Sequence, residues 1–225
     1  MIRFEQVSKV FPDGTVALRD VDLVFDEKGF IFVVGPSGAG KTTLLNLLIR
    51  RYLPTEGSVW YQDRNVGKMP SRYIPGLRRE IGMIFQDFKL LPRLTVHENV
   101  AFGMEAVGRP HQEVRELVPY ILKLVGLEDK MNCYPHQLSS GQAQRVSIAR
   151  AMVQEPKVLL ADEPTGNLDY STGWEIIQLL QQINQWGTTV IMATHDRDIV
   201  NSLRNRVVRI EEGVVVEDNA VGSYN

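Results

Sequence analysis

The sequence has one cysteine, Cys133, and no long apolar segment. A single cysteine excludes an intrachain disulfide and a zinc site built from cysteines, and it favours a reducing, cytosolic setting. The clearest apolar run, residues 30–34, has the length of a strand, far below the ~18 residues that a membrane-spanning helix needs. The N-terminus also lacks the continuous apolar core of a secretory signal. We therefore expect a cytosolic protein whose work at a membrane, if any, needs a partner.

A strong charge of one sign is absent as well. The 225 residues carry a formal net charge of −2 at pH 7, so nothing favours broad, sequence-independent binding to nucleic acid. Hydrophobic residues make up 44% of the chain, which is ample for one sizeable core.

Apolar patterns predict an α/β core. Residues 2–34 alternate apolar and charged positions around a turn, as strands do. Continuous apolar runs predict three buried strands, at 30–34, 158–161 and 189–193. Helical patterns cover 41–51 and 174–183. This alternation is typical of a parallel sheet in an α/β protein.

The middle of the chain, from about residue 87 to 153, reads as a mostly helical insert in that core. Residues 112–125 keep helical spacing, and Gly126 suits a helix end. Pro119 lies inside the pattern, so we expect a kink or a break there. No repeat or linker separates independent domains. We predict a single domain over 1–218 and a flexible tail over 219–225.

A glycine-rich turn follows the first buried strand. Residues 35–42 read GPSGAGKT, which fits the phosphate-binding pattern G-x-x-x-x-G-K-[ST] without a gap. Glycines let backbone N–H groups converge on phosphate oxygens, and a helix N-terminus adds the positive end of its dipole. We expect Lys41 to reach the β- and γ-phosphates and the Thr42 hydroxyl to bind Mg²⁺. Taken alone, the turn predicts only that a nucleoside triphosphate binds.

The apolar run 158–161 ends in two carboxylates, Asp162 and Glu163. Asp162 is well placed to hold Mg²⁺ through its water ligands. Glu163 can accept a proton from the attacking water, or orient it. One acid for the metal and one for the water is what hydrolysis needs, so the pair and the phosphate loop together predict a nucleotide hydrolase.

A third motif, Leu138-Ser139-Ser140-Gly141-Gln142, resembles the LSGGQ signature of the ATP-binding-cassette ATPases. It lies shortly before the acidic strand, as that family requires, and the resemblance covers nearly the whole chain. It implies ATPase activity and a P-loop NTPase fold. That fold has a mostly parallel core sheet, an N-terminal antiparallel β subdomain and a helical subdomain that carries the signature.

The resemblance also implies roles that no local pattern gives. Gln86 matches the Q-loop glutamine and His195 the switch histidine, so the expected catalytic residues are Glu163, His195, Lys41 and Gln86. The expected Mg²⁺ residues are Thr42, Gln86 and Asp162. Phe11 stands where an aromatic residue stacks on adenine. The residues expected to contact ATP are Phe11, Gly35, Pro36, Ser37, Gly38, Ala39, Gly40, Lys41, Thr42, Thr43, Ser139, Ser140, Gly141, Gln142 and, in the D-loop, Asp169.

The signature implies a second copy of the chain. Ser139 and the N–H groups around Gly141 form another anion cradle at a helix start. In this family the cradle closes over the γ-phosphate of the opposite subunit, which implies a homodimer in the ATP-bound state that opens after hydrolysis. Ser140 replaces the usual glycine of the motif. A serine is costly where φ is positive or where the residue must touch phosphate closely, and the motif's next glycine, Gly141, is retained, so we expect a functional but weaker closure.

Three strings narrow the family. Residues 85–91 (FQDFKLL), 95–102 (TVHENVAF) and 162–169 (DEPTGNLD) resemble the FtsE family of bacterial cell-division ATPases. This implies an FtsX-like integral membrane partner and a peripheral position on the inner face of the cell membrane. It implies no span of the chain's own and no nucleic acid. The apolar groups of 87–102 predict that a partner helix docks there and against helices within 104–125.

Other interpretations stay open. The string 162–169 also occurs in ATPases of lipoprotein-release and macrolide or peptide export transporters. A soluble cassette protein acting on ribosomes or DNA is a further alternative, but those usually carry two cassettes or a coiled-coil insert, and this chain has no basic tract. A non-catalytic scaffold is disfavoured because Glu163 and His195 are both present.

Overall fold

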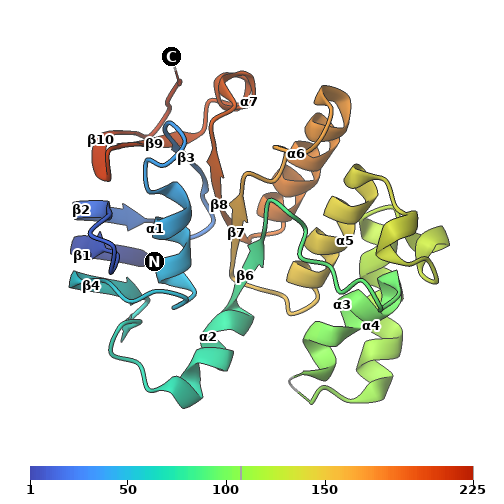
Figure 1. The fold of residues 1–225 in the computed structure, drawn as a ribbon. Helices are drawn as coiled ribbons and strands as arrows, with labels where there is room; N and C mark the ends of the chain where they lie inside the picture. The colour runs from blue at the N-terminus through green and yellow to red at the C-terminus, as the bar shows by residue number, and fades with distance from the viewer. Residues whose placement is uncertain (107, 225) are drawn as a thin grey trace.

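Two β-sheets enclose helix α1 (Lys41–Leu48) in the computed structural model, which describes residues 1–106 and 108–224 (Figure 1). The first sheet is antiparallel, with strand order β2-β1-β4-β5. Its strands are β1 (Ile2–Val10), β2 (Val16–Phe25), β4 (Glu56–Tyr61) and β5 (Arg64–Asn65).

The second sheet has the order β10-β9-β3-β8-β7-β6 and is parallel except at its β10 edge. Its strands are β3 (Phe30–Val34), β6 (Ile81–Ile84), β7 (Val158–Asp162), β8 (Thr189–Thr194), β9 (Arg206–Glu211) and β10 (Val214–Asn219). The structure confirms the expected α/β fold with a mostly parallel core sheet and an N-terminal antiparallel sheet.

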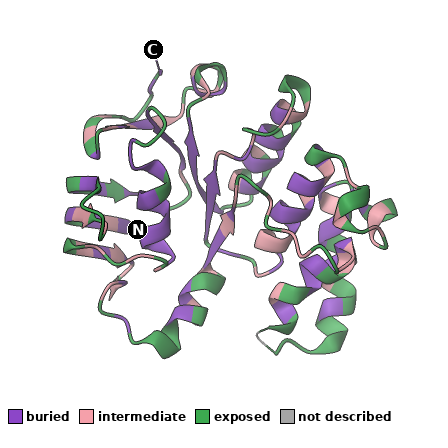
Figure 2. Ribbon diagram, viewed as in Figure 1, coloured by how far each residue is buried: buried purple, intermediate pink, exposed green. Residues whose placement is uncertain are grey.

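Continuous apolar runs form the central strands because both faces of the core sheet are covered. All residues of β3, β7 and β8 are buried (Figure 2). Alternate residues of β3 enter two different hydrophobic clusters: Phe32 and Val34 pack in one, and Ile31 and Val33 in the other. The three buried strands predicted from sequence are thus confirmed.

The remaining helices are α2 (Ile74–Glu80), α3 (Val96–Glu105), α4 (His111–Leu124), α5 (Ser140–Met152), α6 (Tyr170–Gln185) and α7 (Arg197–Leu203). Helices α3, α4 and α5 contact one another on one side of the core sheet (Figure 1). They occupy the middle of the chain, where a helical insert was predicted. Among the described residues, no helix is both long and apolar enough to cross a bilayer.

Helix α4 is continuous through Pro119, so the break considered there does not occur, while a kink stays a prediction. Val114, Val118, Ile121 and Leu122 are buried on one face of α4 in the hydrophobic cluster that also contains residues of α3 and α5. Packing of this face holds the helix together despite the hydrogen bond that proline removes. Helix α4 ends, as expected, before Gly126, whose φ is 71°.

Residues 219–225 were predicted to form a flexible tail, and that stays a prediction. In the described part, the amide of Tyr224 donates to the side chain of Asn201 at 2.7 Å, and Asn201 donates back to the Tyr224 carbonyl at 3.1 Å. The Tyr224 ring is buried.

Candidate functional site

The phosphate loop, residues 35–42, joins β3 to α1 and depends on its glycines. Gly35, Gly38 and Gly40 all have positive φ values, of 150°, 80° and 108°. A Cβ added to Gly35 would lie 2.0 Å from the Ile210 carbonyl oxygen, and one on Gly40 would lie 2.3 Å from that of Ala17. Both glycines are therefore required by close backbone packing. Residues 36–38, by contrast, are exposed at the surface.

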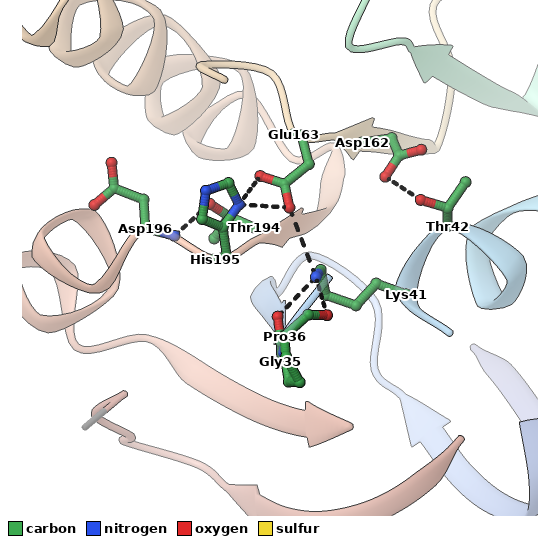
Figure 3. A network of polar contacts seen from close by, with 9 residues as sticks. All are labelled: Gly35, Pro36, Lys41, Thr42, Asp162, Glu163, Thr194, His195 and Asp196. Carbon is green, nitrogen blue, oxygen red and sulfur yellow. Dashed lines mark hydrogen bonds and ion pairs between the residues drawn. The ribbon is translucent and has the colours of Figure 1, made fainter. Parts of the chain in front are cut away.

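Lys41 lies at the start of α1 and folds back over this loop (Figure 3). Its Nζ donates hydrogen bonds to the carbonyl oxygens of Gly35 at 2.7 Å and Pro36 at 3.0 Å. Its side chain is only 7% exposed. The helix cap, Gly40, has no side chain to bond the first amides of α1, which leaves them available to an anion. A buried ammonium and free helix amides together make a phosphate-binding arrangement.

Thr42 and Asp162 meet beside the loop (Figure 3). The Thr42 hydroxyl donates to Asp162 Oδ1 at 2.9 Å. Burial at the end of β7 raises the pKa of the Asp162 carboxyl, while the Thr42 bond and the Lys41 charge act in the opposite direction. A hydroxyl and a carboxylate are oxygen ligands of the kind that Mg²⁺ prefers, so these residues fit a magnesium site.

Gln86 follows β6 and is exposed. Its carbonyl oxygen accepts a hydrogen bond from the Asn167 side chain at 2.9 Å. A Cβ added to Gly166 would lie 3.3 Å from Gln86 Nε2, so the side-chain amide lies against the turn that follows Glu163. The structure thereby places Gln86 against residues 166 and 167, in the turn between Glu163 and α6.

Glu163 lies one residue beyond β7 in a left-handed conformation, with φ 48°. Its amide donates to the Ala193 carbonyl at 2.9 Å, which ties it to β8. The carboxylate approaches His195 Nδ1 at 2.9 Å and Lys41 Nζ at 3.7 Å (Figure 3). The Glu163 side chain is 13% exposed and the His195 side chain 65%. Three expected catalytic residues from three segments thus form one cluster.

The signature residues start α5. Ser139 caps the helix: its hydroxyl accepts from the Gln142 amide at 3.2 Å, and Gln142 Oε1 accepts from the Ser139 amide at 3.0 Å. A Cβ on Gly141 would lie 2.4 Å from Thr172 Cγ2 at the start of α6. Ser140 is an exposed residue of the first turn of α5 and is absent from the residues with positive φ. The conformational cost considered for this serine therefore does not arise.

The two anion cradles lie on opposite faces of the core sheet. Leu44 and Leu45 of α1 pack in one hydrophobic cluster, and Val146 and Ile148 of α5 in the other (Figure 1). One chain thus does not bring the phosphate loop and Ser139 together across its own sheet.

Asp169 and Phe11 lie outside the central cluster. Asp169 caps α6, accepting from the amide and hydroxyl of Thr172 and from the Ser171 hydroxyl. These hydrogen bonds lower the pKa of the Asp169 carboxyl. Phe11 follows β1, and its ring meets the Tyr52 ring edge-on at 5.3 Å between centroids.

Two residues escaped the sequence-based prediction. Gln144, fully buried in α5, donates to the Pro164 carbonyl at 2.7 Å and so links the signature helix to the turn after Glu163. Arg150 donates to the carbonyls of Phe88 at 2.8 Å and Lys89 at 2.6 Å, and burial lowers its pKa. A polar residue among the apolar positions of a helix could have pointed to Gln144. No local pattern in the sequence points to the contacts of Arg150.

Comparisons with known proteins agree with this geometry. The ABC transporter family model matches residues 18–166. The cell division ATP-binding protein FtsE of Bacillus subtilis is 46% identical over 224 residues, covering 100% of this chain and 98% of the relative. FtsE of Escherichia coli is 44% identical over 213 residues, covering 95% and 96%. The dimeric structure of the ATP-binding cassette MJ0796 in a post-hydrolysis state, bound to ADP and Pi, superposes with a TM-score of 0.90 at 36% identity, covering 100% of both chains.

Proposed function

Because this chain belongs to the ABC transporter family of ATPases and is similar to FtsE along its whole length, we propose that it is the motor subunit of a cell-division complex. ATP hydrolysis closes and opens a dimer of the chain, and an FtsX-like membrane protein receives the movement. The observation that carries this proposal is the cluster of Lys41, Glu163 and His195 in a chain 44–47% identical to FtsE of several bacteria.

In this mechanism the phosphate loop binds the triphosphate. Lys41 leaves the carbonyls of Gly35 and Pro36, which it bonds without nucleotide, and moves its ammonium to the β- and γ-phosphate oxygens. Thr42 and Asp162, together with Gln86, would hold Mg²⁺, and the ion would supply positive charge beside the phosphates. The Phe11 ring, at the end of β1, stacks on adenine.

Glu163 then acts on the attacking water. Its carboxylate accepts a proton from that water or orients it toward the γ-phosphorus. The Nδ1 atom of His195 contacts the Glu163 carboxylate. Because the His195 side chain is largely exposed, it has room to turn toward the γ-phosphate. Glu163→Gln in the purified chain tests this role, since turnover should collapse while ATP still binds.

The dimer forms across the two cradles. Ser139 and the amides near Gly141 bind the γ-phosphate held by the partner's loop, which one chain cannot do alone because α1 and α5 lie on opposite faces of its sheet. Asp169, the cap of α6, would contact the ATP bound in this way. Loss of the γ-phosphate removes these contacts, and the dimer opens.

A groove near the Q-loop is the proposed docking site for the membrane partner. It has a volume of about 550 Å³, and its apolar lining includes Met83, Phe85, Leu91 and Phe102. Phe102 is 49% exposed, whereas Leu90 packs on the hydrophobic core. Of the segment 87–102 singled out from sequence, only Lys89, Leu91 and Phe102 line this groove. The other walls come from α2, β6 and α5, from Gly103 of α3 and from Ala106 at the end of α3, which is the part of 104–125 that reaches the groove.

Arg150 connects the groove to the nucleotide site. Its side chain lines the groove and donates hydrogen bonds to the backbone carbonyls of residues 88 and 89, which follow Gln86. Phe88 and Lys89 both have positive φ values, of 58° and 48°, a strained arrangement held by this clamp. Movement of Gln86 on nucleotide binding therefore passes directly to the groove wall.

Because its proposed partner is a membrane protein, the chain works from the cytoplasm, on the inner face of the membrane.

Phe102→Glu tests the docking site, with Tyr120→Glu, an equally exposed aromatic on α4, as the matched control. We expect Phe102→Glu to abolish recruitment to membranes that contain the partner and to block cell division, while ATP binding survives. Normal recruitment of Phe102→Glu would place docking elsewhere. ATP-dependent movement of a defined solute by the reconstituted complex would support the transporter alternative.

A further inference from the structure

Basic side chains surround a second hollow beside the partner groove. It has a volume of about 600 Å³ and is lined by residues of β5, of the following loop and of α2, with Arg64, Lys68, Arg72 and Arg79 as its cations. Arg79 lines both this hollow and the partner groove. We call this surface, formed by residues 64–79, the basic face. It adjoins the docking site and takes no part in the nucleotide site.

The positive charge of the basic face is largely uncompensated. The sequence from 64 to 79, RNVGKMPSRYIPGLRR, holds five cationic residues and no aspartate or glutamate. Among the described residues, Arg64 is the one of these five that forms an ion pair, with Glu80 at 2.9 Å. Within residues 1–106 and 108–224, no carboxylate pairs with Lys68, Arg72 or Arg79, all of which are exposed. The sequence has no continuous basic tract, but the fold gathers spaced cations on one face.

An aromatic residue accompanies these charges. Tyr73 is 54% exposed, and the Arg72 guanidinium lies 4.9 Å from the centre of its ring. Tyrosine combines an apolar ring with a polar hydroxyl and is enriched where protein meets lipid headgroups. A patch of arginine, lysine and exposed tyrosine therefore matches the chemistry of an anionic membrane surface.

We propose that the basic face binds anionic phospholipid headgroups of the membrane surface. The proposal rests on the proposed function in one respect: a membrane protein in the groove brings α2, drawn at the same end of the molecule as the adjoining α3, toward the bilayer (Figure 1). The cations are spread along a loop and a short helix and bond few acceptors of the chain. That spread suits a diffuse layer of headgroup phosphates better than one acidic peptide, which would need paired donors in fixed register.

Binding of the purified full-length chain to vesicles tests this proposal without the partner. Vesicles containing phosphatidylglycerol are compared with vesicles of phosphatidylcholine alone, at low and at physiological salt. Each cationic side chain near an anionic bilayer contributes roughly fivefold in affinity, so Lys68→Gln with Arg72→Gln should weaken binding about 25-fold. We expect the wild type to bind only the anionic vesicles and to detach as salt rises.

The matched control is Lys123→Gln with Arg204→Gln, which removes the same charge at exposed positions on α4 and after α7. Equal weakening in both variants would mean that net charge alone drives binding, and it would overturn the proposal. A wild type that ignores anionic vesicles at low salt would also overturn it. If Lys68→Gln with Arg72→Gln then weakened capture by the partner in neutral lipid, an acidic segment of that protein would be the ligand instead.

Turnover separates this proposal from the proposed function. ATP hydrolysis by the purified Lys68→Gln, Arg72→Gln variant should match the wild type, because neither side chain touches the nucleotide site. If the wild-type chain did not bind anionic vesicles but still hydrolysed ATP in a partner-dependent way, the lipid contact would be disproved. The proposed motor function would not be affected by that result.

Discussion

The Nδ1 atom of His195 lies 2.9 Å from both carboxylate oxygens of Glu163, and Lys41 Nζ lies 3.7 Å from the same carboxylate. These contacts join residues from the start of α1, the end of β7 and the end of β8. The parallel order of β3, β8 and β7 brings the three segments to one edge of the sheet. The Glu163 carboxylate therefore lies between the imidazole of His195 and the ammonium of Lys41.

Glu163→Gln should abolish most turnover without loss of ATP binding. Glutamine keeps the shape and a hydrogen-bond acceptor for His195 but cannot take a proton, and one general base typically contributes ~10²–10⁴-fold. Steady-state phosphate release together with nucleotide titration measures both effects. An ATPase rate in the variant close to that of the wild type would remove Glu163 from the mechanism.

Lys41→Ala should weaken ATP affinity as well as turnover. The variant removes the ammonium that bonds the loop carbonyls of Gly35 and Pro36. Lys41→Arg should not restore binding, because a planar guanidinium does not replace a compact ammonium in a buried position. Unchanged affinity of Lys41→Ala, measured by titration with a fluorescent ATP analogue, would contradict the phosphate-loop assignment.

Asn99→Leu should destabilise the chain by about 2–4 kcal/mol, because it leaves the partly buried Leu91 amide and Leu94 carbonyl without their hydrogen-bond partner. Asn99 is fully buried in α3; its Oδ1 accepts from the Leu91 amide at 2.8 Å. Its Nδ2 lies 3.0–3.1 Å from the carbonyls of Leu91, Leu94 and Thr95. Chemical denaturation measures the loss. The exposed Gln112→Leu is the control, and an equally small change in both would disprove the role of Asn99.

Glu80 should make stability depend on pH. Burial, the largest single influence, raises the pKa of this carboxyl, but hydrogen bonding and charge from Arg64 outweigh it and leave the pKa below its ordinary value of 4.5. The native state therefore stays deprotonated to lower pH than the unfolded chain. The stabilisation is complete above pH 4.5 and fades as the pH falls through the lower native value.

The matching experiment is the free energy of unfolding of Glu80→Gln, measured from neutral pH to pH 3 by denaturant. At neutral pH the variant should be less stable by about 0.5–1 kcal/mol, as expected for a partly exposed pair. The difference should shrink toward acidic pH. A pH-independent difference, or one no larger than that of the exposed Glu128→Gln, would contradict this role.

Local patterns in the sequence predicted the parts of the fold whose burial is continuous. The runs that became β3, β7 and β8 are apolar throughout because helices cover both faces of the sheet. The helix predicted over 41–51 ends at Leu48 instead, because the chain turns there and Arg50 has a positive φ of 50°. Helix α4 continues through Pro119 because its buried face packs in the hydrophobic cluster. The strand order β2-β1-β4-β5 has no local signal, since β4 pairs with β1 only after the chain has passed through α1.

The cluster of Lys41 and Glu163 was predictable because their motifs combine a fixed spacing with a helix start or a strand end, whereas the expectations for Gln86 and His195 came from the family resemblance. The clamp of Arg150 on the carbonyls of Phe88 and Lys89 was not predictable, because it joins residues 61 and 62 positions apart with no pattern in either segment. The same holds for the basic face, where charges separated along the chain become neighbours only in the folded structure.

The central claim is that ATP joins two copies of this chain, each supplying Ser139 to the partner's phosphate loop. Light scattering of Glu163→Gln with Mg-ATP tests it most directly, because blocked turnover should trap the closed state. We predict a particle of twice the 25.5 kDa chain with ATP, and a monomer with ADP. Adding Ser139→Arg should restore the monomer, since it places bulk and charge in the cradle. A Glu163→Gln chain that stays monomeric at high concentration in Mg-ATP, or a dimer that survives Ser139→Arg, would contradict this account.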